Sequence, residues 1–307
     1  MLKIIFFGAG QFGVPALQKL AAAHQIVKVF CPPPRPSGRK MRPVSVPLAE
    51  AARALSLPLA ETEAAAANAE AVRLSADAII ACDYGALLPS AVCDSARLGA
   101  FNIHPSLLPR WRGAAPVWRA MLAGDEKTGV TIIKMGEELD AGDILTQQTI
   151  LISPAMTGGA LHEILAEAGA SLLLKTLRDN PPPIPQNPQL ATYAKKISAA
   201  DRTLDFTAAA DILARQVRAF APAPGAFAFL DGARVKIFAA ETAESAAETN
   251  APPGAVLSAG RGGIAVACGR GVLALFCLQR EGRRALGAEE FARGYAAFPR
   301  AFAANPA

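Results

Sequence analysis

The chain has 307 residues, of which 52% are hydrophobic and 19% charged, and its formal net charge is +5. This composition excludes an intrinsically disordered protein, because such a chain buries enough apolar surface to offset its ordering entropy. No apolar run approaches the ~18 residues that a bilayer-spanning helix needs, and the start of the chain is typical of a strand, not of a signal peptide. We therefore expect a cytoplasmic protein without a membrane segment. Its length suits two domains of about 100 to 200 residues.

The first half of the chain alternates short β-rich runs with amphipathic runs, a pattern typical of βαβ units. Strands are predicted at residues 3–7, 26–31, 78–82, 100–103 and 129–135, and helices at residues 14–23, 46–55, 64–74 and 158–177. We therefore predict an α/β fold over residues 1–180, a Rossmann-like doubly wound, mainly parallel sheet that forms the catalytic domain.

A proline-rich connection separates this domain from a second one. Prolines at positions 181–183 and 185 exclude both a helix and a central strand, so residues 181–205 are expected to be a linker. After a further helix that ends at Pro222, short β-rich runs follow closely and two of them flank Asp231-Gly232, a strong hairpin signal. We predict a small OB-like β-barrel over residues 206–307, with a long loop at residues 239–253.

The cysteines and histidines favour no metal site. The five cysteines form no CxxC pair and lie in apolar stretches, and the three histidines are scattered along the chain. We therefore expect reduced core cysteines, with neither a disulfide framework nor a bound metal.

A complete GxGxxG pattern, GAGQFG, occupies residues 8–13 between the first strand and the first helix. It fits a dinucleotide site, but that site also needs an acidic residue about 20 positions further on. The second strand ends at Cys31 and Pro32 without a carboxylate. We therefore favour a tight turn of small residues and predict that the protein does not bind NAD.

Asn102 and His104 stand two positions apart at the end of a predicted strand, with Pro105 after them. Residues at i and i+2 of a strand point to the same face, and open α/β sheets bind ligands at their strand ends. An amide that holds an oxyanion beside an imidazole that moves a proton suits acyl transfer. The alternative is a capping Asn and a structural His.

An acidic, glycine-bearing loop follows the strand that ends near Met135. It carries Glu137, Glu138, Asp140 and Asp143. This loop is either a solvated turn, a weak cation site, or the source of a carboxylate that orients His104. The pattern alone does not choose among the four acids.

Two groups of basic residues suggest a polyanionic partner. The first, Arg35, Arg39, Lys40 and Arg42, lies in a proline-flanked stretch without an acid. The second lies in the predicted barrel and includes Arg261, Arg270, Arg283 and Arg284. A basic barrel favours a nucleic acid, whereas a solvated charge cluster is the alternative for the first group.

NIHPSLLP at residues 102–109, with LDAG at residues 139–142, resembles the signature of the 10-formyltetrahydrofolate-dependent formyltransferase family. RWRGAAP at residues 110–116 narrows the resemblance to the methionyl-tRNA formyltransferases, and the likeness runs from the first strand to the barrel. It implies transfer of the formyl group of 10-formyltetrahydrofolate to the α-amino group of methionyl initiator tRNA. It also implies that the folate is a co-substrate and that neither a metal nor a covalent enzyme intermediate takes part. We expect a monomer.

The resemblance also implies roles for individual residues. Asn102, His104 and Asp140 match the catalytic triplet. Folate-contacting candidates are Leu107, Leu108, Pro109 and Arg110, joined by Tyr84, Gly85 and Leu88. The stretch with Arg35, Arg39, Lys40 and Arg42 matches a tRNA-inserting loop, and we add the barrel arginines named above to the tRNA-binding candidates.

The chain departs from this family at two places. The family usually reads Gly-Thr-Pro-x-Phe where this chain has GAGQF at residues 8–12, and it usually has Asp where this chain has Pro34.

A formyltransferase for a sugar nucleotide or for glycinamide ribonucleotide would share the triplet but lack both basic groups. A formyltetrahydrofolate hydrolase, an NAD oxidoreductase and a non-catalytic RNA-binding module are the further alternatives.

Overall fold

The computed structural model describes residues 1–37, 41–243, 250–295, 298 and 300–305. The chain forms two compact units. The first consists of Met1–Val117, Lys127–Leu151 and His162–Lys195, and the second of Trp118–Glu126, Ile152–Leu161 and Lys196–Ala307. The stretch expected to be a linker is divided between them: residues 181–195 belong to the first unit and residues 196–205 to the second.

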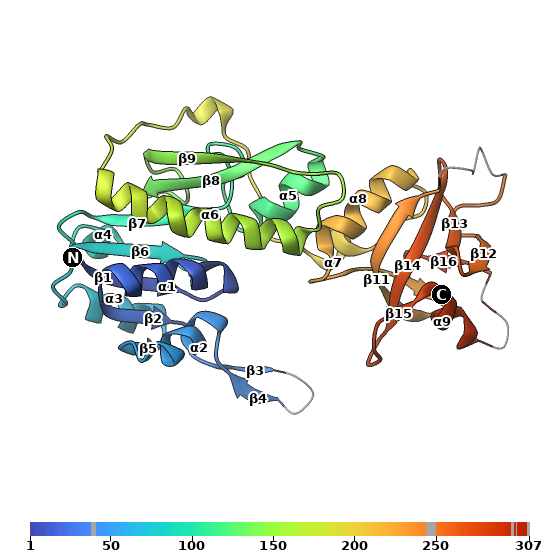
Figure 1. The fold of residues 1–307 in the computed structure, drawn as a ribbon, viewed down its shortest axis with the longest axis horizontal. Helices are drawn as coiled ribbons and strands as arrows, with labels where there is room; N and C mark the ends of the chain where they lie inside the picture. Colours follow the sequence, from blue (N-terminus) through green and yellow to red (C-terminus); the bar gives the residue numbers. More distant parts are fainter. Residues whose placement is uncertain (38–40, 244–249, 296–297, 299, 306–307) are drawn as a thin grey trace. The chain divides into compact units, whose positions relative to one another are not determined.

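A seven-stranded sheet in the order β5-β2-β1-β6-β7-β8-β9 forms the centre of the first unit (Figure 1). Its strands are β1 (Lys3–Gly8), β2 (Gln25–Cys31), β5 (Leu59–Glu61), β6 (Ala78–Cys82), β7 (Ala100–His104), β8 (Lys127–Lys134) and β9 (Ile144–Leu151). The first five are parallel, whereas β8 and β9 are antiparallel to their neighbours. The predicted mainly parallel α/β sheet is confirmed, and β9 is a strand that the sequence pattern did not indicate.

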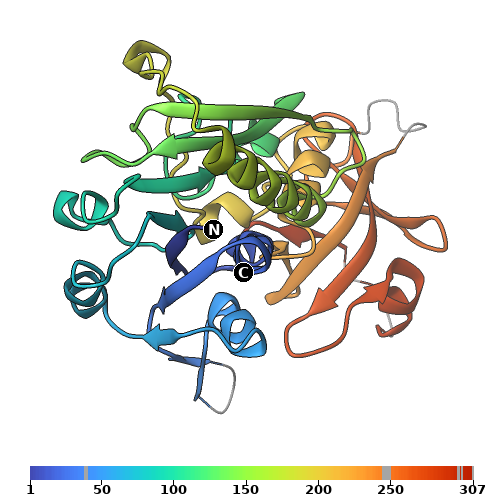
Figure 2. The ribbon, with the colours of Figure 1, turned by 60° about the vertical axis from the view of Figure 1, so that its left-hand side comes forward.

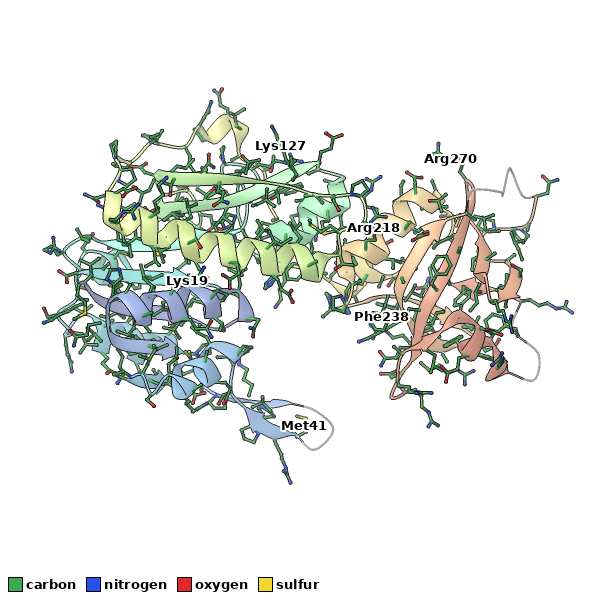
Figure 3. The ribbon with its side chains drawn as sticks, viewed as in Figure 1. Lys19, Met41, Lys127, Arg218, Phe238 and Arg270 are labelled. Carbon is green, nitrogen blue, oxygen red and sulfur yellow. The ribbon has the colours of Figure 1, made fainter. Side chains whose placement is uncertain are left out.

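Helices cover both faces of this sheet. On one face α1 (Val14–Ala23) lies beside α6 (Gly158–Asp179), and Lys19 joins them through Glu167 Oε2 at 2.9 Å and Ser171 Oγ at 2.8 Å (Figure 3). Ile5 and Phe7 of β1 pack in a hydrophobic cluster with residues of α3 (Ala64–Ala71) and α4 (Ser90–Cys93). Alternate residues of a strand face opposite sides, so β1 is buried on both. Among the described helices, none has the length and apolarity required to cross a membrane.

A two-stranded hairpin of β3 (Arg35–Ser37) and β4 (Arg42–Val44) follows β2. The hairpin extends away from the sheet of the first unit, before α2 (Pro47–Ala54) returns the chain to it (Figure 2). The sequence pattern predicts a loop here, because a proline in each strand removes the usual strand signal.

The second unit contains an antiparallel barrel and the helix α8 (Ala210–Phe220). The strands are β10 (Ala226–Leu230), β11 (Ala233–Thr242), β12 (Val256–Gly260), β13 (Gly263–Ala267), β14 (Val272–Arg280), β15 (Leu286–Gly287) and β16 (Phe302–Ala303), with the helices α7 (Ala199–Arg202), α5 (Pro116–Ala123) and α9 (Ala288–Arg293). The strand order is β12-β13-β14-β11-β10-β16, and a bridge between Ala255 and Ala301 closes the ring. This confirms the predicted small β-barrel, although β11 continues to Thr242, within the stretch predicted as a loop.

Local sequence explains why these barrel elements form. Asp231 and Gly232 both have positive φ, 50° and 70°, as the two-residue turn between β10 and β11 requires. Leu213, Val217 and Phe220 of α8 are buried in the core of the barrel, whereas Ile212, predicted on the same face, is 49% exposed.

All five cysteines are free, and four of them are buried. Burial is the largest cause that raises the pKa of Cys31, to about 12, and it also raises the pKa of Cys82. Such thiols stay protonated and unreactive at neutral pH, which agrees with the predicted reduced core cysteines.

Candidate functional site

The site lies at the carboxyl edge of the sheet in the first unit, where β1, β6 and β7 end side by side. Gly8 at the end of β1 pairs with Cys82 at the end of β6, and Ala81 of β6 pairs with Asn102 of β7. Asn102 and His104 therefore stand at the edge where open parallel sheets bind their ligands.

Asp140 is the acid that joins Asn102 and His104. Asn102 Nδ2 donates to Asp140 Oδ1 at 3.3 Å, and His104 Nδ1 lies 3.6 Å from Asp140 Oδ2. The backbone N–H of Gly113 donates to the same Oδ2 at 2.8 Å. Asp140 has a φ of +53°, a left-handed conformation that Asp tolerates better than most residues. The three residues implied by the resemblance thus form one contiguous group.

His104 is buried, and both of its ring nitrogens face acceptors. Nε2 lies 2.9 Å from the backbone oxygen of Trp111, opposite the carboxylate of Asp140 on the Nδ1 side. A ring held between two acceptors has a fixed orientation, and a doubly protonated imidazole would donate to both.

A network of hydroxyl and amide groups holds the turn at residues 105–110. Ser106 Oγ donates to the backbone oxygen of Arg110 at 2.6 Å, and Thr131 Oγ1 donates to that of Ser106 at 2.6 Å. Gln147 Nε2 donates to the backbone oxygen of Leu108 and to Thr131 Oγ1, both at 2.9 Å. None of the bracing side chains Ser106, Thr131 and Gln147 was among the sequence candidates.

The predicted folate-contacting residues have different degrees of exposure. In the turn, Leu107 and Pro109 are half-buried, Leu108 is buried, and Arg110 is exposed with its guanidinium 4.5 Å from the centre of the Trp111 ring. After β6, the side chains of Tyr84 and Leu88 belong to the core cluster that contains Phe7, whereas Gly85 is exposed with a φ of +78°. The side chains of Tyr84 and Leu88 therefore contribute to the core of the unit and not to its exposed surface.

Gln186, from the stretch predicted to be a linker, connects two parts of the site. Its Oε1 accepts hydrogen bonds from Nε and Nη2 of Arg112, and its Nε2 donates to the backbone oxygens of Asp140 and Gly142 at 2.8 and 2.7 Å. Nearby, Thr192 Oγ1 accepts from the backbone N–H of Trp111 at 2.9 Å. Sequence reasoning missed Gln186 and Thr192, because the prolines around them indicate only an extended chain.

The predicted tRNA-binding residues fall into three sets. Arg35 and Arg42 are exposed on the β3–β4 hairpin, whereas Arg39 and Lys40 lie outside the described residues. Three barrel arginines pair with acids: Arg261 with Glu289 at 3.4 Å, Arg270 with Asp211 at 3.5 Å, and Arg284 with Glu290 at 2.5 Å. Arg283 is exposed in the turn after β14. Exposed pairs of this kind are weak, so they leave the arginines available to a polyanion.

Within the described part of the chain, no three His, Cys, Asp or Glu side chains gather into a group that could hold a metal ion.

Comparison with known families identifies the fold of both units. A family model described as formyl transferase matches residues 2–177, and one described as formyl transferase, C-terminal domain, matches residues 196–296. The chain belongs to the formyl transferase family. The match over residues 2–177 contains the whole Asn102, His104 and Asp140 group.

Individual relatives extend this result. A protein named methionyl-tRNA formyltransferase from Cereibacter sphaeroides is 42% identical over 299 residues, which cover 96% of each chain. One with the same name from Acidiphilium cryptum is 44% identical over 96% of this chain and 97% of its own. The matches are nearly full-length on both sides, so they include both units.

Solved structures share the fold at low sequence identity. HypX from Aquifex aeolicus in complex with tetrahydrofolic acid is 19% identical, with a TM-score of 0.65 over 96% of this chain and 47% of HypX. An N-formyltransferase from Helicobacter canadensis, in complex with folinic acid and dTDP-3-aminofucose, is 17% identical, with a TM-score of 0.65 over 91% of this chain and 100% of its own.

Proposed function

We propose that the protein transfers the formyl group of 10-formyltetrahydrofolate to the α-amino group of methionyl initiator tRNA, which yields N-formylmethionyl-tRNA for translation initiation. The observation that carries this proposal is the joining of Asn102, His104 and Asp140 at one sheet edge of a chain that is 42% identical to a methionyl-tRNA formyltransferase. The donor supplies a formyl carbon that an amine can attack.

Asn102 is proposed to stabilise the negative charge that builds on the formyl oxygen. Its Nδ2 carries two protons, and one of them is used in the bond to Asp140 Oδ1. Within the described residues, the second N–H has no protein acceptor, so it is available to the substrate. A preorganised donor of this kind typically contributes about 10²- to 10³-fold in rate.

His104 is proposed to move the proton that the reaction must transfer. As the amine nitrogen bonds to the formyl carbon and the bond from that carbon to the donor nitrogen breaks, the amine loses a proton and the donor nitrogen gains one. The 3.6 Å separation between His104 Nδ1 and Asp140 Oδ2 is longer than a hydrogen bond, and such contacts often tighten only when substrate is present. Asp140 is proposed to orient the ring.

The turn at residues 105–110 is proposed to hold the folate beside this group. Leu107 and Pro109 are half-buried and offer apolar surface to a flat ring, and exposed Arg110 offers a cation to the folate carboxylates. The hydrogen bonds from Thr131 and Gln147 keep the turn rigid, which limits the ordering cost of binding.

The β3–β4 hairpin is proposed to bind the acceptor end of the tRNA. Arg35 and Arg42 lie on its two strands and are exposed, and it follows β2, two strands away from β6 along the same edge. We propose in addition that the barrel arginines contact the phosphate backbone, and that the protein acts as a cytoplasmic monomer.

The deciding experiment incubates the full chain with 10-formyltetrahydrofolate and methionyl initiator tRNA, and then detects formylmethionine after mild hydrolysis. A parallel incubation replaces the tRNA with an amino sugar nucleotide, and a third contains no acceptor. Formylation of the tRNA alone supports the proposal. Formylation of the sugar, or release of formate without an acceptor, would replace it with one of the alternatives.

A further inference from the structure

Asp83 is a second carboxylate at the catalytic edge, directly after β6. Its carboxylate lies against Gly10, in the turn after β1, where a Cβ atom on residue 10 would overlap Asp83 Oδ2. The carboxylate fits because residue 10 is a glycine, at the position where the family usually has proline. The unusual GAGQFG turn thus makes room for an acid.

In the part of the chain that the structure describes, Asp83 has no partner for its carboxylate, and its backbone conformation is strained. Within the described residues, its carboxylate has neither a hydrogen bond nor an ion pair. Desolvation by the surrounding protein raises its pKa, although the residue as a whole is exposed to solvent. Its φ of +51° is a left-handed conformation, which costs free energy unless the local structure holds it. Unpartnered, strained and partly desolvated acids cluster at functional sites.

The order of the strands places this carboxylate on the acceptor side of the edge. The sheet runs β2-β1-β6-β7. The hairpin proposed to bind tRNA follows β2, the GAGQFG turn follows β1, and the turn proposed to bind folate follows β7. Asp83 follows β6 and its carboxylate contacts the β1 turn, so it points away from the folate turn and toward the side of the hairpin.

We propose that Asp83 binds the α-ammonium group of the aminoacyl ester and positions it for attack. This inference rests on the proposed function. The α-ammonium is the cationic centre of the acceptor, and an unpartnered carboxylate gains most from a cationic donor. The pterin offers only neutral N–H groups, and the folate carboxylates would be repelled. The ammonium must first release one proton to water to become the amine that attacks. Because a carboxylate accepts hydrogen bonds from both a charged and a neutral amine, Asp83 can stay bound to the nitrogen through this step.

A double-mutant cycle between protein and ligand tests this contact. The dissociation constant is measured for the full chain with methionyl initiator tRNA and with its α-hydroxy counterpart, in which a hydroxyl replaces the amine. Both are measured for wild type, Asp83→Asn and Asp94→Asn. Asp94 is an exposed carboxylate at the end of α4 without an assigned role, so it serves as the matched control.

We expect Asp83→Asn to weaken binding of methionyl-tRNA by about tenfold, the typical size of one charged hydrogen bond. Binding of the α-hydroxy ligand should change by less than about twofold, and Asp94→Asn should change neither. Equal effects on both ligands would overturn the proposal, as would a raised KM for the formyl donor with unchanged tRNA binding, which would place the pterin at Asp83.

Gly10→Ala is the second variant, because it keeps the acid but displaces it. The backbone of Gly10 has a φ of −79°, which alanine adopts without strain, so the added methyl acts only on Asp83. Gly10→Ala should weaken binding of methionyl-tRNA as much as Asp83→Asn does, and it should leave binding of the α-hydroxy ligand nearly unchanged. If it binds methionyl-tRNA like wild type, the contact is absent. If the wild-type protein formylates methionyl-tRNA but Asp83→Asn weakens binding of both ligands equally, this inference alone is refuted. If the wild-type protein forms no formylmethionine, the proposed function is refuted.

Discussion

Gln186 Oε1 accepts hydrogen bonds from two nitrogens of the Arg112 guanidinium, Nε at 3.0 Å and Nη2 at 2.8 Å. Arg112 is 6% exposed, and burial of an unpaired guanidinium is expensive. Through its Nε2, the same glutamine holds the backbone on either side of Ala141. One amide therefore satisfies a buried cation and fixes the loop that carries Asp140.

Replacing Gln186 with leucine should impair both stability and catalysis. The change keeps much of the volume but removes the bonds to Arg112 and to the Asp140 loop. We expect kcat to fall by up to about 10²-fold, the cost of a displacement near 1 Å in an active site, together with a lower melting temperature. Steady-state kinetics and thermal unfolding measure the two effects. Gln189→Leu, three positions away and exposed, is the control, and an equal loss there would contradict the bracing role.

Replacing Asn102, His104 or Asp140 with alanine should strongly lower the rate of formyl transfer and leave the affinity for tRNA nearly unchanged. Loss of an oxyanion donor costs about 10² to 10³ in rate, and loss of an acid–base group about 10² to 10⁴. Double variants should lose much less than the product of the single losses, because the residues act as a unit. Single-turnover rates and tRNA titrations check this. A variant that keeps more than about a tenth of the wild-type rate removes that residue from the triplet.

Glutamine at Arg35 and Arg42 should raise the KM for charged tRNA without changing the KM for the formyl donor. Each lost phosphate contact should reduce the slope of log affinity against log salt by about one unit. Titrations at several salt concentrations measure that slope for the double variant. Arg73→Gln, a surface change in the same unit, should leave it unaltered. Slopes equal to wild type would show that these cations are only solvated.

Nicotinamide cofactors should not bind the turn at residues 8–13. Strand β2 ends at Cys31 without a carboxylate for the ribose. Asp83 occupies the space beside Gly10, where its charge would repel a pyrophosphate. Isothermal calorimetry with NAD and NADP should therefore give no saturable heat. Binding in the micromolar range would revive the dehydrogenase alternative.

Asp201→Asn should lower the melting temperature at neutral pH and have little effect in acid. The hydrogen bond from Arg119, 2.7 Å long, is the largest cause that lowers the pKa of Asp201 from 3.8 to about 2. A carboxyl whose pKa is lower in the folded protein stabilises it above the unfolded pKa, and this contribution disappears as the pH falls from 3.8 to about 2. Melting curves of wild type and variant should therefore converge over that range. A difference that stays constant with pH would show that the ionised form of Asp201 does not contribute to stability.

The sequence by itself determined the parts of this protein that depend on local pattern. Buried apolar runs predicted the strands that became β1, β6 and β7, and Asp231-Gly232 predicted the hairpin of the barrel. The two-residue spacing of Asn102 and His104 predicted that both would face one side at a strand end, because the side-chain period of a strand is two. These features involve neighbours in the chain, so a short window of sequence contains their cause.

Only the tertiary structure decided which distant groups meet. The local pattern left Asp140 as one of four acids, and only the family resemblance pointed to it. The fold brings it to Asn102, 38 positions away, and Gln186 reaches the backbone of Asp140 across 46 positions. Asp83 became relevant only because β1 and β6 pair in parallel and a glycine faces its carboxylate. Such contacts depend on strand order and loop paths, which result from the packing of the whole unit, so no local pattern marks the residues that take part.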